Sequence, residues 1–295
     1  MEIIKNIEGL LGTSIDIENT IIFIDEIQVS ERAISSLKYF CESEEKYKIV
    51  VAGSLLGVKV NRFKSSFPVG KVWLDYLYPM DFEEFLMVVN ETKLLELIKE
   101  SYNKMIPMLD ATHNKALSLY NEYICLGGMP AAILNYIEHD KDIYKFEDSV
   151  LNMIITSYFA DMSKYTENIE ALRNNKIYNS MPAQLGKENK KFKYSLVEKS
   201  ARSREYESSM EWLLSSNQYE VDFLINIEGD IIPVEVKASD NTSSKSLNYY
   251  IKRFNPKYAI RISSKNFGMS NGIKSIPLYA SFMIWFLNYK NIIIR

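Results

Sequence analysis

Two carboxylates directly follow a short apolar run near the start of this sequence. The run Ile21–Ile24 leads into Asp25 and Glu26, and a continuous apolar run of this length is typical of a strand buried on both faces of a parallel sheet. Open α/β sheets bind ligands at the carboxyl edge of their strands. There an aspartate can hold Mg²⁺ beside a phosphate, and the next glutamate can orient a water molecule. The alternative is that both carboxylates cap the following helix.

A lysine and two further carboxylates surround a Glu-Gly-Asp turn at 228–230, which two apolar runs flank. Such a turn is typical of a β-hairpin. A two-residue loop at 228–229 places Asp222 opposite Glu235, and a loop one residue later places Asp222 opposite Lys237. Either register puts the three side chains on one face, because strand side chains alternate, whereas a three-residue loop separates them.

Carboxylates and a lysine on one face can bind Mg²⁺ and lower the pKa of its bound water. Lys237 can then stabilise the attacking hydroxide or the charge that develops on a phosphate. The alternative is an exposed hairpin face on which Glu235 and Lys237 form an ion pair.

A predicted strand-helix-strand arrangement positions the first pair of carboxylates. Apolar residues recur at helical spacing from Ser30 onward, and Lys48–Ser54 predicts a second buried strand that ends in a turn of small residues. Two such units place Asp25, Glu26 and Ser54 at the same edge of one sheet. For Ser54 the alternative is an ordinary turn serine.

The middle of the chain is predicted to be helical, and its last part is locally basic. Residues 168–214 indicate three short helices with polar turns, and their cationic residues are Lys187, Lys190, Lys191, Lys193, Lys199, Arg202 and Arg204. Short helices with a basic second half suggest a helix-turn-helix module and DNA as a partner. The alternative is a solvated face, because several glutamates dilute the charge. Further strands are expected at 257–263 and 272–276.

Composition bounds the class of protein. The 295 residues carry a formal net charge of -3, so no global charge bias indicates a nucleic-acid or membrane surface. Two distant cysteines, Cys41 and Cys125, argue against a disulfide framework and fit a cytoplasmic location. No signal peptide or membrane partner is expected. His113 and His139 have no ligand-like spacing, so we interpret them as surface or packing residues.

The order of five blocks resembles a family of bacterial and archaeal AAA-type ATPases fused to a C-terminal domain of unknown function. The blocks are FIDEIQ, VVAGSLLG, SFPVGKV, YPMDFEEFL and YNEYICLGGMPAA, the last with a Gly-Gly-x-Pro turn after a helix. The resemblance implies ATP and Mg²⁺ as cofactors. It implies that Asp25 is a metal ligand in a Walker B element, that Glu26 is catalytic and that Ser54 binds the nucleotide.

The hairpin sequence EVDFLI, followed by IIPVEVKAS, is similar to the core of PD-(D/E)xK nucleases. This resemblance implies Asp222 and Glu235 as metal ligands and Lys237 as the catalytic lysine. In the AAA-type ATPase family named above, the region that corresponds to residues 168–214 is similar to a winged helix.

Two departures from the family pattern change the expected activity. The sequence has no GxxxxGK[ST] motif, whose backbone amides and lysine would bind the phosphates. Trp212 is also followed almost at once by the hairpin, so an intervening helix and strand are missing. We therefore expect a chain that is truncated at its ATPase domain and internally shortened, with little or no ATP turnover. A lost strand would also leave an open sheet edge that favours self-association.

Together these features predict an α/β fold with four parts. The expected parts are a partial P-loop-type ATPase core with a parallel sheet at 1–85, a helical lid at 86–166, a winged-helix-like basic module at 167–214 and a nuclease-like α/β hairpin domain at 215–295. The predicted function is that of an AAA-type ATPase impaired in hydrolysis. The alternative is a metal-dependent nuclease-like protein, or a DNA- or partner-binding protein, that acts through the C-terminal domain.

Overall fold

The structure is a computed structural model with a mixed α/β fold, as the sequence predicts. It describes residues 2–44, 46–53, 70–73, 75–165, 168–186, 192–199, 202–215, 224–227, 230–237, 247, 251–252 and 255–284. The chain divides into two compact units, one formed by 1–76 with 161–219 and the other by 77–160 with 220–295. None of the helices in the described ranges is long and apolar enough to cross a membrane.

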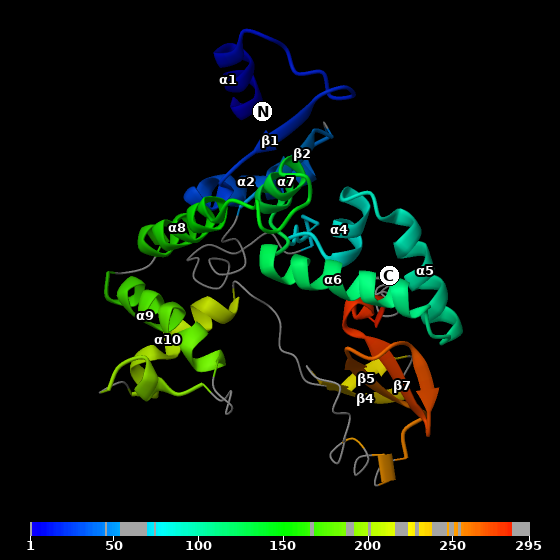
Figure 1. Cartoon of the computed structure of the whole chain (residues 1–295). Coiled ribbons are helices and arrows are strands. Elements are labelled where there is room, and N and C mark those ends of the chain that lie inside the picture. The colour runs from blue at the N-terminus through cyan, green and yellow to red at the C-terminus, as the bar shows by residue number, and fades with distance from the viewer. Residues whose placement is uncertain are drawn as a thin grey trace. The chain divides into compact units, whose positions relative to one another are not determined.

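The N-terminal segment contains a two-stranded parallel sheet and three helices. Its elements are α1 (Glu2–Leu11), β1 (Ile21–Ile24), η1 (Ile27–Val29), α2 (Glu31–Glu42) and β2 (Lys48–Val51). The two strands pair in parallel with Phe23 opposite Val50 (Figure 1). The predicted strand-helix-strand arrangement is therefore confirmed for the described residues.

The prediction that both faces of this sheet are buried is wrong. Ile34 and Leu37 of α2 pack beneath one face, which Ile24 and Val51 contribute to. The other face stays open, and Phe23 is 60% exposed. The apolar run indicates a strand that packs on something, and here the partner is α2 on one face. The sequence pattern does not show whether one or both faces of a strand are covered.

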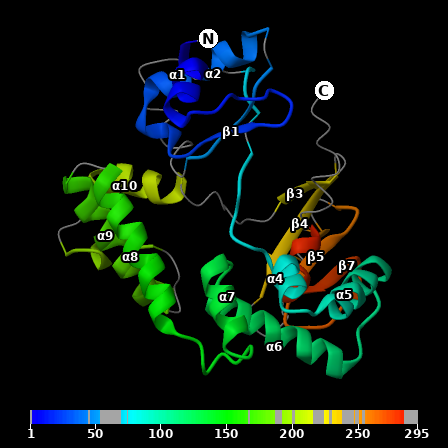
Figure 2. The same cartoon turned by 90° about the horizontal axis from the view of Figure 1, so that it is seen from above.

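The helical segment after residue 148 contains α8 (Asp148–Tyr165), α9 (Asn168–Leu185), η2 (Tyr194–Leu196) and α10 (Ser203–Ser215). Helices α9 and α10 pack against each other and bury Ile177 and Tyr206 (Figure 2). The Tyr206 hydroxyl donates to Glu198 at 3.2 Å, and Glu198 also pairs with Lys176 at 2.5 Å. Polar contacts therefore connect the turn after α9 to both helices.

Besides most of α8, the described part of the second unit has four α-helices and a five-stranded sheet. The helices are α4 (Phe82–Val88), α5 (Thr92–Lys104), α6 (Asp110–Leu126) and α7 (Pro130–Glu138). Helix α4 begins at Asp81, which forms a capping box with Glu84 because each side chain accepts from the other residue's backbone N–H. The cap explains why the helix starts at this point in the sequence.

The sheet has the strand order β3-β4-β5-β7-β6. Its strands are β3 (Leu224–Ile227), β4 (Asp230–Val236), β5 (Ala259–Ser263), β6 (Gly268–Ser270) and β7 (Ile273–Pro277), followed by η3 (Leu278–Ala280). Strands β4, β5 and β7 are parallel, and the two outer strands are antiparallel to their neighbours. Strands β5 and β7 confirm the strands expected at 257–263 and 272–276.

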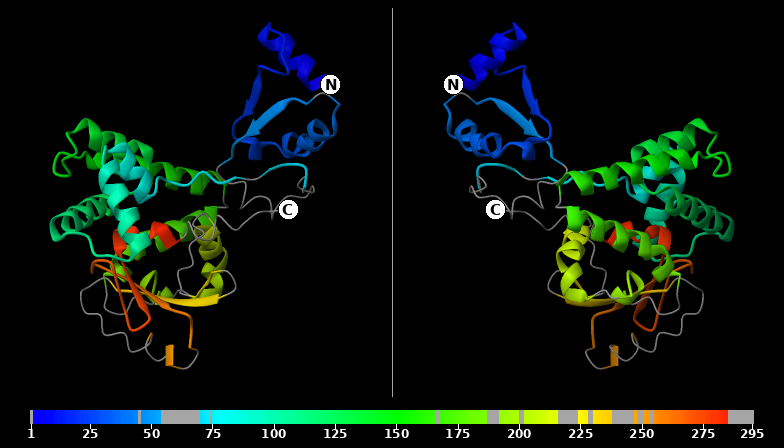
Figure 3. Two further views of the ribbon diagram at one scale, coloured as in Figure 1. Left: turned by 90° about the vertical axis from the view of Figure 1, so that its right-hand side faces the viewer. Right: turned by 90° about the vertical axis from the view of Figure 1, so that its left-hand side faces the viewer.

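One hydrophobic core joins α4, α5 and α6 to this sheet. Figure 3 shows the ribbons of these helices beside the strands. Phe85 and Ile98 from the helices and Ile260 and Ile276 from the strands are all buried in it. The helices that follow residue 77 therefore pack on strands more than 100 residues further along the chain. The division into four parts predicted above stays a prediction.

A backbone clasp holds the turn between α6 and α7. The predicted Gly-Gly-x-Pro turn is confirmed, because α6 ends at Leu126 with Gly127 as its C-cap and α7 begins with Pro130. The Met80 N–H donates to the Gly128 carbonyl at 2.8 Å. The Tyr123 hydroxyl donates to the Met80 carbonyl at 2.8 Å. The segment before α4 is thus fixed to the turn by the Met80 N–H and to α6 by the Met80 carbonyl.

Candidate functional site

Asp25 and Glu26 lie at the carboxyl end of β1, where two hydrogen bonds attach the chain to β2. The Ala52 N–H donates to the Ile24 carbonyl at 2.9 Å, and the Ile27 N–H donates to the Ala52 carbonyl at 3.0 Å. The two acidic residues form a short protrusion between these bonds, and both are exposed. This position is where a parallel sheet presents ligand-binding residues.

The backbone at Glu26 adopts an uncommon conformation. Its φ of 50° and ψ of 39° lie in the left-handed region, which costs a residue with a side chain roughly 1–2 kcal/mol. The Glu26 N–H donates to the Asp25 carboxylate at 2.9 Å, and the Glu26 carboxylate accepts from the Gln28 amide at 2.5 Å. Strain of this kind is common where a side chain must be aimed for function.

The alternative that these carboxylates cap the next α-helix is wrong. Helix α2 is capped by Ser30, whose hydroxyl accepts from the Ala33 N–H at 3.3 Å. Glu26 precedes the single turn η1 and makes no side-chain capping bond there. Ser54, the third residue predicted at this edge, lies outside the described residues.

This arrangement fits a Mg²⁺ ion that a nucleotide brings with it. Asp25 supplies an exposed carboxylate, and Mg²⁺ in phosphate sites takes one or two carboxylates with the remaining ligands from phosphate and water. Within the described ranges no cluster of three or more His, Cys, Asp or Glu side chains could hold a metal by itself.

The second candidate site lies on the β3–β4 hairpin. Ile227 pairs with Asp230, and Leu224 pairs with Pro233, so the hairpin has the two-residue loop at 228–229. The alternative of a loop one residue later is wrong, as is the three-residue loop. Asp222 lies outside the described residues.

Glu235 and Lys237 share one face of β4. The Lys237 ammonium lies 3.2 Å from Glu235 Oε1, and the two side chains are 36% and 16% exposed for lysine and glutamate respectively. Glu235 Oε2 is buried and has no hydrogen-bond partner among the residues that the structure describes. A buried carboxylate oxygen of this kind normally has a partner, so a cation would satisfy it.

Strand β5 adds a residue that the sequence analysis missed. Arg261 pairs with Glu235 across the parallel strands, and the Lys237 N–H extends the ladder by donating to the Ile262 carbonyl at 2.8 Å. The available signal was the alternation in the sequence AIRIS, which places a single cation between two isoleucines. Residues paired in register have their side chains on one face, so Arg261 lies beside Glu235.

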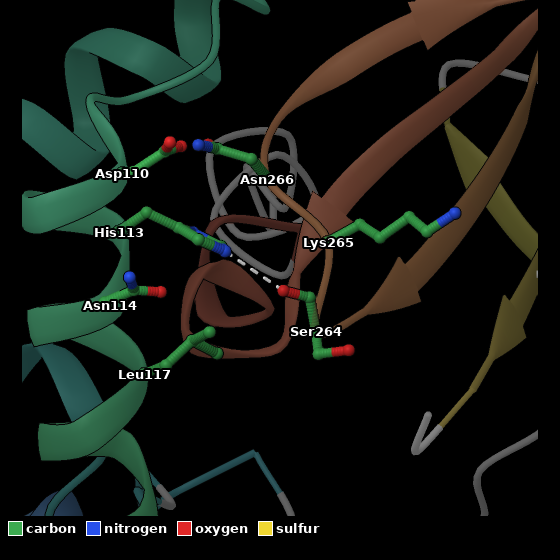
Figure 4. Close-up of a pocket in the computed structure, with 7 residues that line it drawn as sticks. All are labelled: Asp110, His113, Asn114, Leu117, Ser264, Lys265 and Asn266. Carbon is green, nitrogen blue, oxygen red and sulfur yellow. Dashed lines mark hydrogen bonds between the residues drawn. The ribbon is translucent and has the colours of Figure 1, made fainter. Parts of the chain in front are cut away.

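A cavity of about 570 Å³ lies between α6 and the loop after β5, and Figure 4 shows its lining residues. His113 is buried there, with Nδ1 2.8 Å from the Tyr279 hydroxyl and Nε2 3.1 Å from the Ser264 carbonyl. The carbonyl only accepts, so Nε2 carries a proton. Asp110 and Asn266 point toward one another at the rim. Both ring nitrogens of His113 are engaged, which confirms its interpretation as a packing residue.

Comparison with protein families matches three regions of the chain, two of which overlap. Residues 2–86 match a family described as an AAA domain, and residues 195–281 match a domain of unknown function, DUF4143. Residues 117–221 match another domain of unknown function, DUF8612. No curated protein and no solved structure matched the chain.

Residues 2–86 are therefore similar to an AAA domain, and residues 195–281 are similar to DUF4143. The AAA match includes the acidic end of β1, and the DUF4143 match includes β4 and β5. Both candidate sites therefore lie inside regions that match these two domain models. AAA proteins as a family use nucleotide and Mg²⁺.

Proposed function

We propose that this protein is an AAA-type ATPase-like protein with a formed Walker B half-site and impaired ATP turnover. The observation that carries the proposal is the pair Asp25 and Glu26 at the carboxyl end of β1, fixed on both sides by hydrogen bonds to Ala52. The sequence has no GxxxxGK[ST] motif. Phosphate binding therefore lacks its usual source of backbone amides and its lysine.

In this proposal Asp25 holds Mg²⁺, and Glu26 orients a water molecule toward the γ-phosphate. The metal, when bound, neutralises phosphate charge. The hydrogen bond from the Gln28 amide already holds the Glu26 carboxylate in position for this role. Ser54 remains the proposed contact to the nucleotide, by family resemblance.

Purified protein titrated with a fluorescent ATP analogue and Mg²⁺ is expected to show no saturable binding in the micromolar range and no phosphate release. The reason is that Asp25 and Glu26 supply metal and water contacts but little phosphate-binding energy. Asp25→Ala serves as the control and should give the same traces. Micromolar binding or ATP turnover that Asp25→Ala abolishes would overturn the proposal that turnover is impaired. It would support the proposal that Asp25 and Glu26 form a working half-site.

A second candidate function is metal-dependent cleavage of a phosphodiester at the C-terminal sheet. It is favoured by the buried Oε2 of Glu235, which lacks a hydrogen-bond partner in the described part of the chain, and by Lys237 at 3.2 Å from the other oxygen. Continuing the observed hairpin register by two residues would place Asp222 opposite Glu235 as a second ligand. A divalent cation there would supply an activated water, and Lys237 would stabilise charge on the phosphate.

Supercoiled plasmid incubated with the protein and Mn²⁺ or Mg²⁺ is expected to be nicked, and Lys237→Ala is expected to reduce nicking about 100-fold or more because one charged transition-state contact is lost. Lys93→Gln, an exposed charge change on α5, is the matched control. The measurement is the rate of open-circle formation on a gel. Nicking that Lys237→Ala and Glu235→Gln leave unchanged would come from a contaminant, and the candidate would be rejected.

Two partner proposals rest on exposed surfaces of the first unit. DNA is supported by exposed cationic residues around the start of α10, namely Lys193, Lys199, Arg202 and Arg204. Self-association is supported by the open apolar face of the β1–β2 sheet, where Ile21 is 63% exposed.

A further inference from the structure

Two polar side chains are buried in the contact between α9 and α10. Asn174 of α9 and Ser209 of α10 are both 0% exposed. The two helices pack against each other, and Arg173, the neighbour of Asn174, lies over the Tyr206 ring at 5.7 Å from its centroid. Ser209 follows Tyr206 by about one helical turn. Both buried polar residues therefore belong to the contact between these helices.

The polar atoms of these two side chains have no hydrogen-bond partner in the described part of the chain. The atoms are Oδ1 and Nδ2 of Asn174 and Oγ of Ser209. The next residue along the chain is different, because the Asn175 amide donates to the Ala171 carbonyl at 3.0 Å. A polar group that loses water and gains no partner favours any state in which water reaches it again. The contact between α9 and α10 therefore contains groups that oppose its closure.

Two further features weaken this helix pair. Pro182 lies inside α9 and has no N–H to donate to the carbonyl four residues earlier. Among the described side chains of α9 and α10, the buried apolar ones are Ala171, Ile177 and Tyr206. Helix α5 alone buries as many apolar side chains. The pair is thus held together by little apolar contact.

We propose that α9 and α10 form a helix pair that opens within the folded protein, with the turn between the two helices as the hinge. Opening would return the Asn174 amide and the Ser209 hydroxyl to water, which offsets part of the apolar contact that is lost. At the hinge, the Glu198 carboxylate accepts from Lys176 of α9 and from Tyr206 of α10. The turn is thus attached to both helices.

Opening would uncover an apolar strip that is absent from the closed surface. The strip contains Ile177 of α9 and Tyr206 of α10, both of which are buried in the closed pair. A ligand that binds this strip has affinity for the open state alone, so it would shift the population toward that state. The helix pair would then act as a switch, whether or not the acidic end of β1 supports ATP turnover.

Removing a buried polar side chain is expected to close the pair rather than to loosen it. Asn174→Leu keeps the branched shape of the side chain and replaces the amide with methyl groups. Backbone amide exchange in α9 and α10 should therefore slow about tenfold. Ser209→Ala removes only a hydroxyl and should slow exchange about fivefold. This second variant gives the test if leucine is too large for the site.

The measurement is hydrogen–deuterium exchange of the full chain, followed by mass spectrometry of peptides. In the wild type, peptides from α9 and α10 should exchange about 100-fold faster than peptides from α5, which packs in the core of the second unit. Asn175→Leu is the matched control, because it makes the same change at the adjacent residue, whose amide has a partner. It should not slow exchange. Circular dichroism establishes that each variant is folded.

Slower exchange in α9 and α10 of Asn174→Leu or Ser209→Ala, with α5 unchanged, supports the opening pair. Unchanged or faster exchange in both variants would overturn it. Wild-type exchange as slow in α9 and α10 as in α5 would also overturn it, because the pair would then stay closed. Slowing of the same size by Asn175→Leu would assign the effect to leucine and reject the role of the buried amide. Since the experiment contains no nucleotide and no nucleic acid, its outcome is separate from both candidate functions.

Discussion

Gly128→Ala is expected to destabilise the second unit by about 3–4 kcal/mol, because overpacking against rigid backbone forces the chain apart. A Cβ at residue 128 would lie 2.1 Å from the Met80 carbonyl oxygen and 3.0 Å from the Met80 nitrogen. Neither atom can rotate away as a side chain could. Relief would break the hydrogen bond from Met80 to Gly128 and the one from Tyr123 to Met80.

The measurement is urea unfolding followed by circular dichroism. Gly268→Ala is the matched control, because a Cβ there meets no atom within 4 Å and the backbone is not left-handed; it should change stability by about 0.5 kcal/mol or less. Gly127→Ala should fall between the two, since φ is 72° without any close contact. A Gly128→Ala midpoint equal to that of Gly268→Ala would show that the clasp does not form.

Tyr279→Ala is expected to destabilise the same unit by about 4–5 kcal/mol, the sum of a large cavity and lost buried hydrogen bonds. Tyr279 is fully buried, and its hydroxyl lies 2.8 Å from His113 Nδ1 and 3.3 Å from Met108 Sδ. Its ring packs edge-on to Phe267 with centroids 6.1 Å apart. One side chain thus connects α6, the loop before α6 and the loop between β5 and β6.

Tyr279→Phe separates packing from hydrogen bonding, because it keeps the ring and removes the hydroxyl. Its expected effect is about 1–3 kcal/mol, from leaving His113 without that partner. The comparison uses the same urea unfolding experiment. Equal destabilisation by Tyr279→Phe and Tyr279→Ala would mean that the cavity collapses and that the hydroxyl carries the whole effect.

The same residue gives a signature at high pH. Burial raises the pKa of Tyr279 above its usual value near 10, and burial raises the pKa of Tyr102 to about 12. Above pH 10 the unfolded chain loses these protons while the folded chain keeps them, so stability falls as pH rises from 10 toward 12. Tyr279→Phe should flatten that fall relative to its own stability at pH 7.

Local features of the fold could be predicted because neighbouring residues determine them. The apolar runs before Asp25 and after Lys48 became paired parallel strands. The glycines at 127 and 128 and the proline at 130 became the end of one helix and the start of the next. The hairpin was predicted with its register among three alternatives, and the structure selected one.

Long-range packing could not be predicted from the same patterns. Amphipathic helices such as α5 show which face is buried, but not that the partner is a sheet more than 100 residues away. The prediction that both faces of β1 are buried was wrong because it, too, depended on packing partners that the local sequence does not identify. At the candidate sites, Glu235 and Lys237 could be predicted from their spacing in the sequence. Arg261 could not, because its place beside Glu235 depends on the parallel pairing of β4 with β5.

The second unit is built from two stretches of chain, 77–160 and 220–295, and this affects how it is made in the cell. During synthesis, Phe85 and Ile98 leave the ribosome before the strands that cover them exist. At roughly 5–20 residues per second, the wait for β7 lasts on the order of ten seconds. An amphipathic helical segment exposed for that long is a binding target for chaperones. Yield of folded protein should therefore depend more on chaperone supply than on the final stability of the unit.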